Sequence, residues 1–597
     1  MTSTPSLRRS HSRSAARPRG RAVKPRRVSG GGPSGRRPRR ASPRHRLLLV
    51  WGLLLLGMLG LAGKLAQLQL FKGAQLKAQA EEQQQIYSVP RAARRSMIDR
   101  SGDVLAVDRV VYTLYVHPLL FKQSPAAIAE TIGELIERPQ ADLVAQFAQQ
   151  DTGIKLMNDV PEALAQRIRQ ARLDGIELIP SQKRFYPQQA LLSQLVGYIN
   201  LDGEAQAGLE YSLQGHLEYP SDPETQTTYN PLRQESVRDN LKLQLTIDSR
   251  LQRVAQRQLE ATVQQHGAKR GAVLVMDSRN GELLAMAMTP TYDPNRYYEA
   301  ELAEFRNWVV SDVYEPGSTF KPINVAIALQ EGIIGPDDYI FDEGRLIYDQ
   351  WTIKNADYGS VGGRGSITIT DILRHSSNVG MVHIMEKLDR AIYFNWLHKL
   401  GLGQPTGIEL PAEAAPQLKD RAQFVASPVE AATTAFGQGF AITPLHLVQM
   451  HAALANGGTL VTPHVVRGLV DGDGDLAWQP DRPGTQKIFS AGVTQDVLAM
   501  MEAVVQSGSG EPAQVAGYRI GGKTGTSQKA SSSGTYGSGR VTSFVSILPI
   551  DEPRYVVLAV IDEPSTPNAY GSTVAAPLVK TVIEALAVLE GVAPGAE

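Results

Sequence analysis

Residues 315–322 read EPGSTFKP and open an apolar stretch that runs to about Gln330, which predicts the start of a buried helix. Pro322 is compatible with this helix because it falls in the first turn. Ser318 and Lys321 are three residues apart and therefore share one helical face. A serine hydroxyl is a weak nucleophile that needs a neighbouring base, and a neutral lysine can serve as that base. The positive end of the helix disfavours the protonated amine.

Two further short segments carry polar side chains suited to the same chemistry. Residues 374–380, RHSSNVG, lie between two helical stretches and supply the hydroxyl of Ser376 and the amide of Asn378; alone, they are typical of an ordinary helix N-cap. Residues 521–526, GGKTGT, combine glycines that permit close approach of a ligand with the positive charge of Lys523; alone, they are typical of a glycine-rich turn. A lone Ser-x-x-Lys arises by chance in a chain of 597 residues, so the three segments are informative only together.

The region around these segments, from Leu241 onward, has the pattern of one large α/β unit. Apolar residues at helical spacing predict one helix over residues 248–265 and a closing helix over residues 576–590. Apolar runs separated by turn signals predict two hairpins, which pair 271–277 with 282–288 and 541–548 with 555–562. We therefore expect an α/β (α+β) fold, in which an antiparallel sheet carries helices on its faces, and not a doubly wound parallel sheet.

The composition excludes several kinds of chemistry. The chain has no cysteine, which excludes disulfides, thiolate metal sites and a cysteine nucleophile. Of its 61 basic residues, 15 fall in residues 1–46, which contain no acidic residue; the remainder holds 46 basic against 60 acidic residues. The acidic balance of the main body argues against nucleic-acid binding. The basic tail is rich in Arg, Pro, Ser and Gly and is expected to be disordered.

An apolar run directly follows this tail. Residues 47–63 read LLLVWGLLLLGMLGLAG, and apolar residues beyond Lys64 extend the run on one side. This length predicts a single transmembrane helix over residues 47–68. A cleaved signal peptide is the alternative, and the long arginine-rich tail and the lack of a clear cleavage site argue against it. We therefore interpret the basic tail as a signal that sets the membrane orientation and not as a nucleic-acid-binding segment. Positive residues stay in the cytoplasm, so residues 72–597 are expected to lie outside it. No later stretch is expected to be long and apolar enough to span.

Together, the Ser318-x-x-Lys321, Ser376-x-Asn378 and Lys523-Thr524-Gly525 elements occur in the order found in penicillin-binding proteins and serine β-lactamases. Residues 241–597 resemble the transpeptidase domain of class B penicillin-binding proteins, with supporting matches at Leu245-Thr246-Ile247-Asp248, Phe436-Gly437-Gln438-Gly439 and Asn456-Gly457-Gly458. Residues 69–240 resemble the non-catalytic pedestal of that family, which gives four expected parts: a tail (1–46), a transmembrane helix (47–68), a pedestal (69–240) and a transpeptidase domain (241–597).

The pedestal resemblance rests on residues 94–106 and on Gly208-Leu209-Glu210. The first of these matches the family's opening motif, R-G-x-I-x-D-R-x-G-x-x-L-A, except that Arg95 replaces the glycine and Met97 the isoleucine. The tight turn that glycine normally provides is therefore not assured at Arg95.

The resemblance implies a reaction and roles for nine residues. Ser318 attacks the carbonyl of a D-Ala-D-Ala stem peptide of peptidoglycan, with Lys321 as the base. Ser376 relays a proton to the leaving group, Asn378 orients the substrate, and Lys523 keeps Lys321 neutral. Substrate binding is implied for Ser377, Thr524, Gly525 and Thr526, with Lys523 and the two threonines at the substrate carboxylate. β-Lactams are expected to acylate Ser318, and no metal or other cofactor is implied.

The resemblance also implies partners and a location. Residues 315–317 and 376–380 look more like the division-specific FtsI type than the elongation type. This implies septal cell-wall synthesis beside an FtsW-type glycan polymerase and other division proteins. It further implies a single-pass protein of the bacterial cytoplasmic membrane, with a cytoplasmic N-terminus and an extracytoplasmic catalytic domain. An elongation-type transpeptidase, a D,D-carboxypeptidase, a serine β-lactamase and a β-lactam sensor remain the alternatives.

Overall fold

The computed structural model describes residues 43–67, 93–219, 239–348, 351–530 and 536–595. The chain divides into two compact units, Met1–Val89 and Pro90–Glu597, which are described separately below. The basic tail up to residue 42 and the polar stretch predicted to leave the membrane at residues 72–85 lie outside the described residues.

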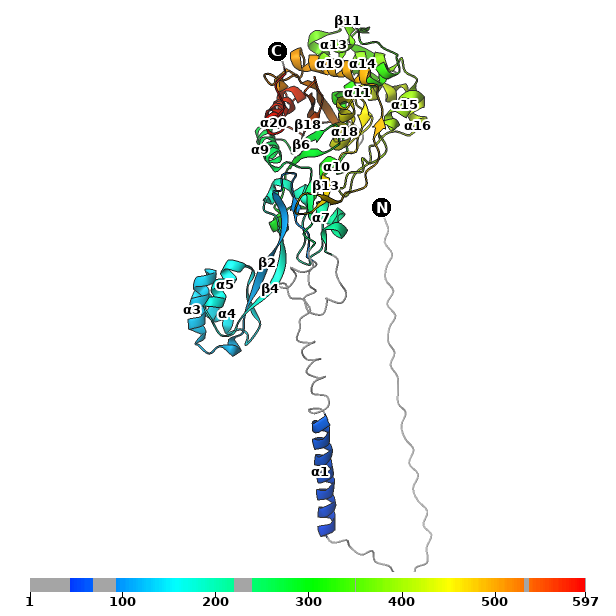
Figure 1. Ribbon diagram of the computed structural model, residues 1–597. Helices are drawn as coiled ribbons and strands as arrows, with labels where there is room; N and C mark the ends of the chain where they lie inside the picture. The colour runs from blue at the N-terminus through cyan, green and yellow to red at the C-terminus, as the bar shows by residue number, and fades with distance from the viewer. Residues whose placement is uncertain (1–42, 68–92, 220–238, 349–350, 531–535, 596–597) are drawn as a thin grey trace, which may run out of the picture. The chain divides into compact units, whose positions relative to one another are not determined.

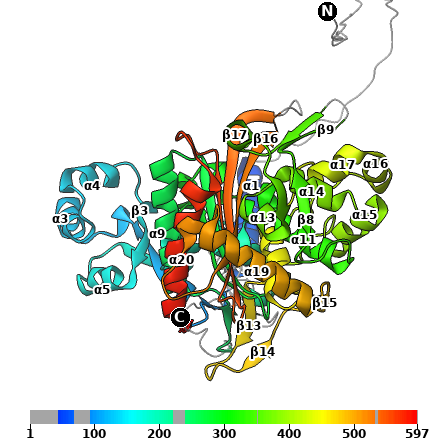
Figure 2. The ribbon, with the colours of Figure 1, turned by 90° about the horizontal axis from the view of Figure 1, so that it is seen from above.

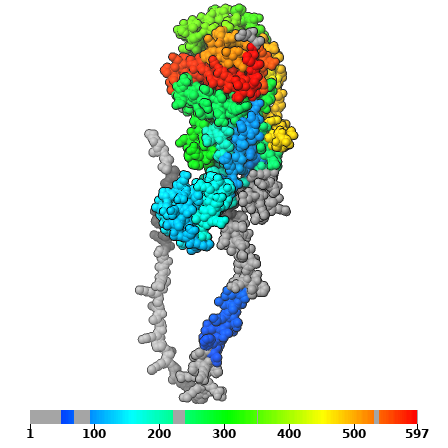
Figure 3. Space-filling view, turned by 60° about the vertical axis from the view of Figure 1, so that its left-hand side comes forward, coloured from blue at the N-terminus to red at the C-terminus, as the bar shows by residue number. Residues whose placement is uncertain are grey.

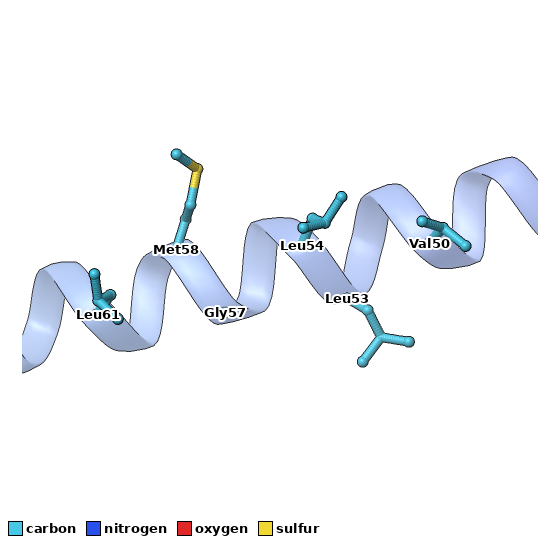
Figure 4. Close-up of a pocket in the computed structure, with 6 residues that line it drawn as sticks. All are labelled: Val50, Leu53, Leu54, Gly57, Met58 and Leu61. Atoms are coloured by element: carbon cyan, nitrogen blue, oxygen red, sulfur yellow. The ribbon is translucent and has the colours of Figure 1, made fainter.

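In the first unit, helix α1 (Pro43–Ala66) carries the apolar run. Its side chains from Leu48 onward are exposed, and Figure 4 shows Leu53 pointing to the opposite side from Leu54 and Met58. The part from Leu48 to Ala66 is long and apolar enough to cross a membrane. A helix that is apolar all round and has no packed face requires an apolar environment, which supports the predicted span.

A second helix passes the same test of length and composition. It covers Gly571–Leu589, and half of its residues are buried inside the protein. The expectation that no later stretch would be apolar enough to span is therefore wrong. The apolar residues of this second helix pack in the core of the region after residue 240, which accounts for its composition.

A five-stranded antiparallel sheet forms the centre of the second unit. Its strand order is β16-β17-β18-β6-β7, and the strands are β16 (Gly521–Ala530), β17 (Tyr536–Leu548), β18 (Tyr555–Asp562), β6 (Arg270–Asp277) and β7 (Leu283–Thr289). Both predicted hairpins are confirmed, and the last strand pairs with the first because β18 lies beside β6. The motif segment GGKTGT is part of edge strand β16, so it is extended and not a turn.

Helices cover both faces of this sheet. Along β18, Val557 and Ala559 pack in one core cluster while Val556 and Leu558 pack in the other, because neighbouring strand residues point to opposite faces. Helices α9 (Ser249–His266) and α20 (Ala576–Leu589) contribute to the first cluster; α11 (Lys321–Gln330) and α18 (Pro444–Ala455) contribute to the second. Figure 2 shows β16 and β17 between α20 and the green helices α11, α13 and α14. The predicted fold class is confirmed.

Further helices and short strand pairs complete this region. Its helices are α10 (Trp308–Ser311), α12 (Tyr358–Val361), α13 (Ile369–Arg374), α14 (Asn378–Met385), α15 (Arg390–Lys399), α16 (Arg421–Ala426), α17 (Pro428–Thr434) and α19 (Ala491–Ser507). Short strand pairs are β8 (Tyr339–Asp342) with β11 (Gly365–Thr368), β9 (Arg345–Tyr348) with β10 (Trp351–Lys354), and β12 (Thr459–Leu460) with β15 (Gln486–Lys487).

A second sheet joins the region before residue 240 to the region after it. Strand β1 (Met97–Ile98) pairs in parallel with β5 (Lys242–Leu245), and β5 pairs with β13 (Val466–Val470), which pairs with β14 (Leu476–Trp478). On its other side β1 pairs with the long strand β2 (Val104–Val116), which pairs with β3 (Ile154–Pro161) and β4 (Ile176–Phe185). Helices α3 (Pro125–Ile136), α4 (Gln140–Phe147) and α5 (Glu162–Gln170) pack on these strands as a separate lobe (Figures 1 and 3).

A buried ionic network lies where these strands meet. Glu210 is completely buried, and its carboxylate accepts hydrogen bonds from Arg94 Nε at 2.9 Å and from Arg184 Nε at 2.6 Å. Arg184 also donates to Asp108 at 3.0 Å. Arg95, at the glycine position of the motif, is not among the described residues with a positive φ; its guanidinium bonds to Asp239. The backbone at Arg95 therefore does not require glycine.

Replacing Glu210 should destabilise the protein strongly. Glu210→Ala leaves two guanidinium groups buried without their shared carboxylate, and breaking a buried pair in this way costs about 3–5 kcal/mol. We expect a clearly lower midpoint of thermal unfolding, followed by circular dichroism. The matched control is Asp174→Ala, which breaks the ion pair with the exposed Lys122 and should cost less than about 1 kcal/mol. Equal midpoints for the two variants would contradict this role of Glu210.

Candidate active site

The predicted nucleophile lies in a short 3-10 turn that leads into a helix. This turn, η7, covers Gly317–Phe320 and continues as α11, with Pro322 in its first turn. Ser318 is partly exposed, whereas Lys321 is completely buried. The predicted continuous helix thus begins as a tighter 3-10 turn, and the pair Ser318 and Lys321 spans the junction.

The glycine-rich loop at residues 436–439 hydrogen-bonds to this turn and to Glu315 just before it. The Gly317 N–H donates to the carbonyl of Gly437 at 2.9 Å, and the Gly439 N–H donates to the carboxylate of Glu315 at 3.0 Å. A Cβ on Gly437 would lie 2.0 Å from the Gly317 oxygen, and both glycines have positive φ, so only glycine fits. The sequence contained this signal in the run Phe436-Gly437-Gln438-Gly439, but its contact with the nucleophile turn was not predicted.

The Ser376-x-Asn378 segment forms the tight connection between α13 and α14. Ser376 has a φ of 57°, a left-handed conformation that is costly for a residue with a side chain and that is found at functional sites. Ser377 is buried at 1% exposure; its hydroxyl caps α14 by accepting from the Gly380 N–H at 2.8 Å and donates to Asn355. The side chain of Ser377 is therefore hydrogen-bonded within the fold, and the substrate contact that the resemblance implies for it stays a prediction.

Strand β16 brings the Lys-Thr-Gly segment against the nucleophile turn. A Cβ on Gly525 would lie 2.9 Å from Thr319 Cγ2, so the glycine allows the strand and the turn to approach closely. The hydroxyl of Thr524 lies 2.7 Å from that of Ser509, and the hydroxyl of Thr526, an exposed residue, accepts from the Gly571 N–H at 3.1 Å.

Four of the predicted residues form one hydrogen-bonded cluster. The amine of Lys321 donates to the Ser376 carbonyl at 2.6 Å and to Asn378 Oδ1 at 2.7 Å, and it lies 3.2 Å from the Ser376 hydroxyl. The amine of Lys523 lies 3.0 Å from the same hydroxyl. The hydroxyl of Ser376 is thus shared by two lysines whose positions in the sequence are 202 residues apart. No described residue hydrogen-bonds to the hydroxyl of Ser318, which leaves it available to a ligand.

The two lysines share an environment that favours neutral amines. Burial lowers the pKa of Lys523 to about 7. Burial, and then the positive charge of Lys523, hold the pKa of Lys321 well below its ordinary value, while Asp342 and Asp357 act in the opposite direction. A neutral Lys321 beside a hydroxyl can accept a proton, which is the chemistry of a general base. Among the described residues, no group of three His, Asp or Glu side chains could hold a metal ion.

Comparisons with known proteins agree with this geometry. The family described as penicillin binding protein transpeptidase domain matches residues 271–584, and the penicillin-binding protein dimerisation domain matches residues 90–217. A relative from Mesostigma viride, named peptidoglycan D,D-transpeptidase FtsI homolog, is 39% identical over 578 residues, with 92% of this chain and 96% of the relative covered. The peptidoglycan D,D-transpeptidase FtsI of Escherichia coli is 28% identical, with 89% and 90% covered.

A solved structure supports the same assignment. Penicillin binding protein 3 from Mycobacterium tuberculosis, complexed with aztreonam, superposes with a TM-score of 0.66 at 27% identity; 85% of this chain and 98% of that chain are covered. The two matched domains follow one another in this chain, and similarity to whole relatives extends over nine-tenths of it. The chain therefore belongs to the class B penicillin-binding proteins, the transpeptidases that carry a dimerisation domain before the transpeptidase domain.

Proposed function

We propose that this chain is a peptidoglycan D,D-transpeptidase of septal cell-wall synthesis, with Ser318 as its acyl-accepting nucleophile, and that β-lactams acylate the same residue. The observation that carries the proposal is the hydrogen-bonded cluster of Lys321, Ser376, Asn378 and Lys523, together with the accessible Ser318 three residues before Lys321. Relatives named FtsI supply the septal role.

In the first half of the reaction, Ser318 becomes acylated. Its oxygen attacks the carbonyl of the penultimate D-Ala, and neutral Lys321 takes up the hydroxyl proton. The carbon–nitrogen bond to the terminal D-Ala then breaks, and Ser376 delivers a proton to the leaving amine. Ser376 is suited to this transfer because its hydroxyl lies within hydrogen-bond distance of both lysine amines. The backbone N–H groups of Ser318 and Thr526 are our candidates for the oxyanion hole.

The remaining groups hold the substrate. Lys523, Thr524 and Thr526 are placed on edge strand β16, where the terminal carboxylate of the stem peptide would meet positive charge and hydroxyl donors. Gly525 keeps the strand close to the nucleophile turn, and Asn378 orients the peptide amide. In the second half of the reaction, an amine from a neighbouring stem peptide attacks the acyl-enzyme carbonyl, and Ser318 leaves with a proton. Transfer to water instead would make the protein a carboxypeptidase, and a stable acyl-enzyme would make it a sensor.

The location follows from the anchor. We assign residues 1–46 to the cytoplasm, helix α1 to the cytoplasmic membrane and the Pro90–Glu597 unit to its outer side, because positive residues stay inside. An FtsW-type glycan polymerase is the proposed partner in the membrane. Gly60 and Gly63 lie one turn apart on α1, and small residues allow a partner helix to approach closely.

The nucleophile can be tested by covalent labelling. Ser318→Ala should abolish labelling of the full-length chain by a fluorescent penicillin, because the attacking oxygen is absent. Its circular dichroism and thermal midpoint should stay close to those of the wild type, since Ser318 makes no side-chain hydrogen bond among the described residues. Labelling that persists at another serine would refute the assignment.

The base can be tested through the pH dependence of acylation. Lys321 accepts a proton only when neutral, so the rate should rise with pH through its lowered pKa. The rate should fall again as pH rises through about 7, where Lys523 loses the charge that attracts the carboxylate of the β-lactam. Lys321→Ala should reduce the maximal acylation rate by about 10²–10⁴-fold. A near-normal rate in stopped-flow measurements of this variant would identify another group as the base.

Orientation and partner can be tested with one fusion. A fluorescent protein that matures only in the cytoplasm, fused to Met1, should fluoresce and concentrate at the septum. Leu at Gly60 and Gly63 should weaken this recruitment without reducing penicillin labelling, because added Cβ atoms meet nothing within the protein. The control, Ala62→Leu, adds a bulky side chain away from the Gly60 and Gly63 face of α1. Absence of fluorescence would contradict the proposed orientation. Fluorescence along the lateral wall would indicate the elongation type. Unchanged septal recruitment of the leucine variants would show that the Gly60 and Gly63 face of α1 is not the contact.

A further inference from the structure

A buried carboxylate lies directly behind the Ser376–Asn378 turn. Asp342, at the end of β8, is completely buried. One of its oxygens accepts from the Gly344 N–H at 2.7 Å, and both accept from the side-chain amide of Asn355 at 2.9 Å. In the part of the chain that the structure describes, no basic side chain forms an ion pair with Asp342. A buried carboxylate without a counter-ion is costly, so its presence needs an explanation.

Asn355 connects this carboxylate to the Ser376–Asn378 turn through hydrogen bonds. It is 2% exposed, and its Oδ1 accepts from the backbone N–H groups of Asn378 at 2.8 Å and Val379 at 3.2 Å, and from the Ser377 hydroxyl at 3.3 Å. These N–H groups open helix α14 and have no partner within that helix. Asn355 therefore supplies, from a distant segment, the acceptor that the start of α14 requires.

The carboxylate also determines which way the amide of Asn355 points. A carboxylate only accepts hydrogen bonds, so the NH₂ group of Asn355 must face Asp342 and its oxygen must face α14. With an asparagine at position 342, the amide could turn round and present its NH₂ group to the N–H groups of the helix. The charge of Asp342 thus fixes the donor and acceptor pattern beneath the turn.

The Ser376–Asn378 turn, which Asn355 holds in this way, also hydrogen-bonds to the amine of Lys321. Asn378 Oδ1 and the Ser376 carbonyl, 2.7 and 2.6 Å from the Lys321 amine, belong to it. The charged groups that act on Lys321 are Lys523 from β16, Asp342 from β8 and Asp357 just before α12. Both aspartates favour the protonated amine and oppose the effect of Lys523.

We propose that Asp342 and Asn355 are positioning residues for acylation. Asp342, through Asn355, orients the Ser376–Asn378 turn around Lys321, and its buried negative charge favours the protonated form of Lys321. This inference rests on the proposed role of Lys321 as the base.

Three variants of the full-length protein in detergent separate the positioning of the turn from the effect of charge on Lys321. For each variant, acylation by a fluorescent penicillin is followed by stopped flow over a range of pH. Asn355→Ala removes the contact with the turn and should lower the maximal rate by about 10- to 100-fold, as expected for a misplaced catalytic group. Asp342→Asn should lower the maximal rate similarly and also move the acid limb of the pH profile to lower pH, because the negative charge that favours protonated Lys321 is lost.

Asp357→Asn is the matched control for charge. Asp357 acts on Lys321 electrostatically, but its side chain bonds to Arg364 and not to the turn. This variant should move the acid limb to lower pH and keep the maximal rate close to that of the wild type. The double variant of Asp342 and Asn355 should be no slower than the slower single variant, because residues that act as a unit are not additive.

The outcomes distinguish this inference from the proposed function. A wild-type maximal rate in Asn355→Ala, or an unmoved acid limb in Asp342→Asn, would overturn the positioning role while Ser318→Ala still abolished labelling. Labelling that survives in Ser318→Ala would refute the function itself. Thermal midpoints identify variants that do not fold; if Asp342→Asn is one, Asn355→Ala and Asp357→Asn still test the two effects separately.

Discussion

Two lysine amines, buried completely and bonded to a single serine hydroxyl, are the constraint on which the catalytic region depends. Burying an ammonium group is costly, and burying two close together is more costly because their charges repel. The structure meets this cost by lowering the pKa of both amines and by offering Lys321 the oxygens of Ser376 and Asn378. The same burial that lowers these pKa values thus also favours the neutral form of the amines, which the proposed reaction requires of Lys321.

The surrounding fold can be understood as the frame that holds these amines together. Lys523 belongs to the edge strand of a sheet whose inner strands are buried on both faces, and Lys321 belongs to a helix packed on that sheet. Backbone approaches at Gly317, Gly437 and Gly525 bring the nucleophile turn against the strand and the supporting loop. Each is a position where a Cβ would meet neighbouring atoms, so the distance between motifs depends on the absence of side chains.

Much of this architecture could be predicted from local patterns. Apolar runs separated by turn signals predicted both hairpins, and helical spacing predicted α9 and α20 to within a residue or two at each end. Other features could not be predicted, because they depend on partners distant in the chain. The 3-10 turn before α11 is hydrogen-bonded to Gly437, and Arg95, at the glycine position of the family motif, bonds to Asp239.

The sequence by itself determined the chemistry: which hydroxyls, amines and amides are present, their order, and the family to which the order belongs. Only the tertiary structure decided how each is used. It distinguishes α1, whose described side chains are exposed, from the helix at Gly571–Leu589, which is also apolar enough to span a membrane but is half buried. It turns Ser377 into a helix cap and places Asp342 and Asn355 behind the catalytic turn. The physical reason is that residue type and periodicity are local properties of a chain, whereas burial and hydrogen-bond partners arise only when distant segments pack together.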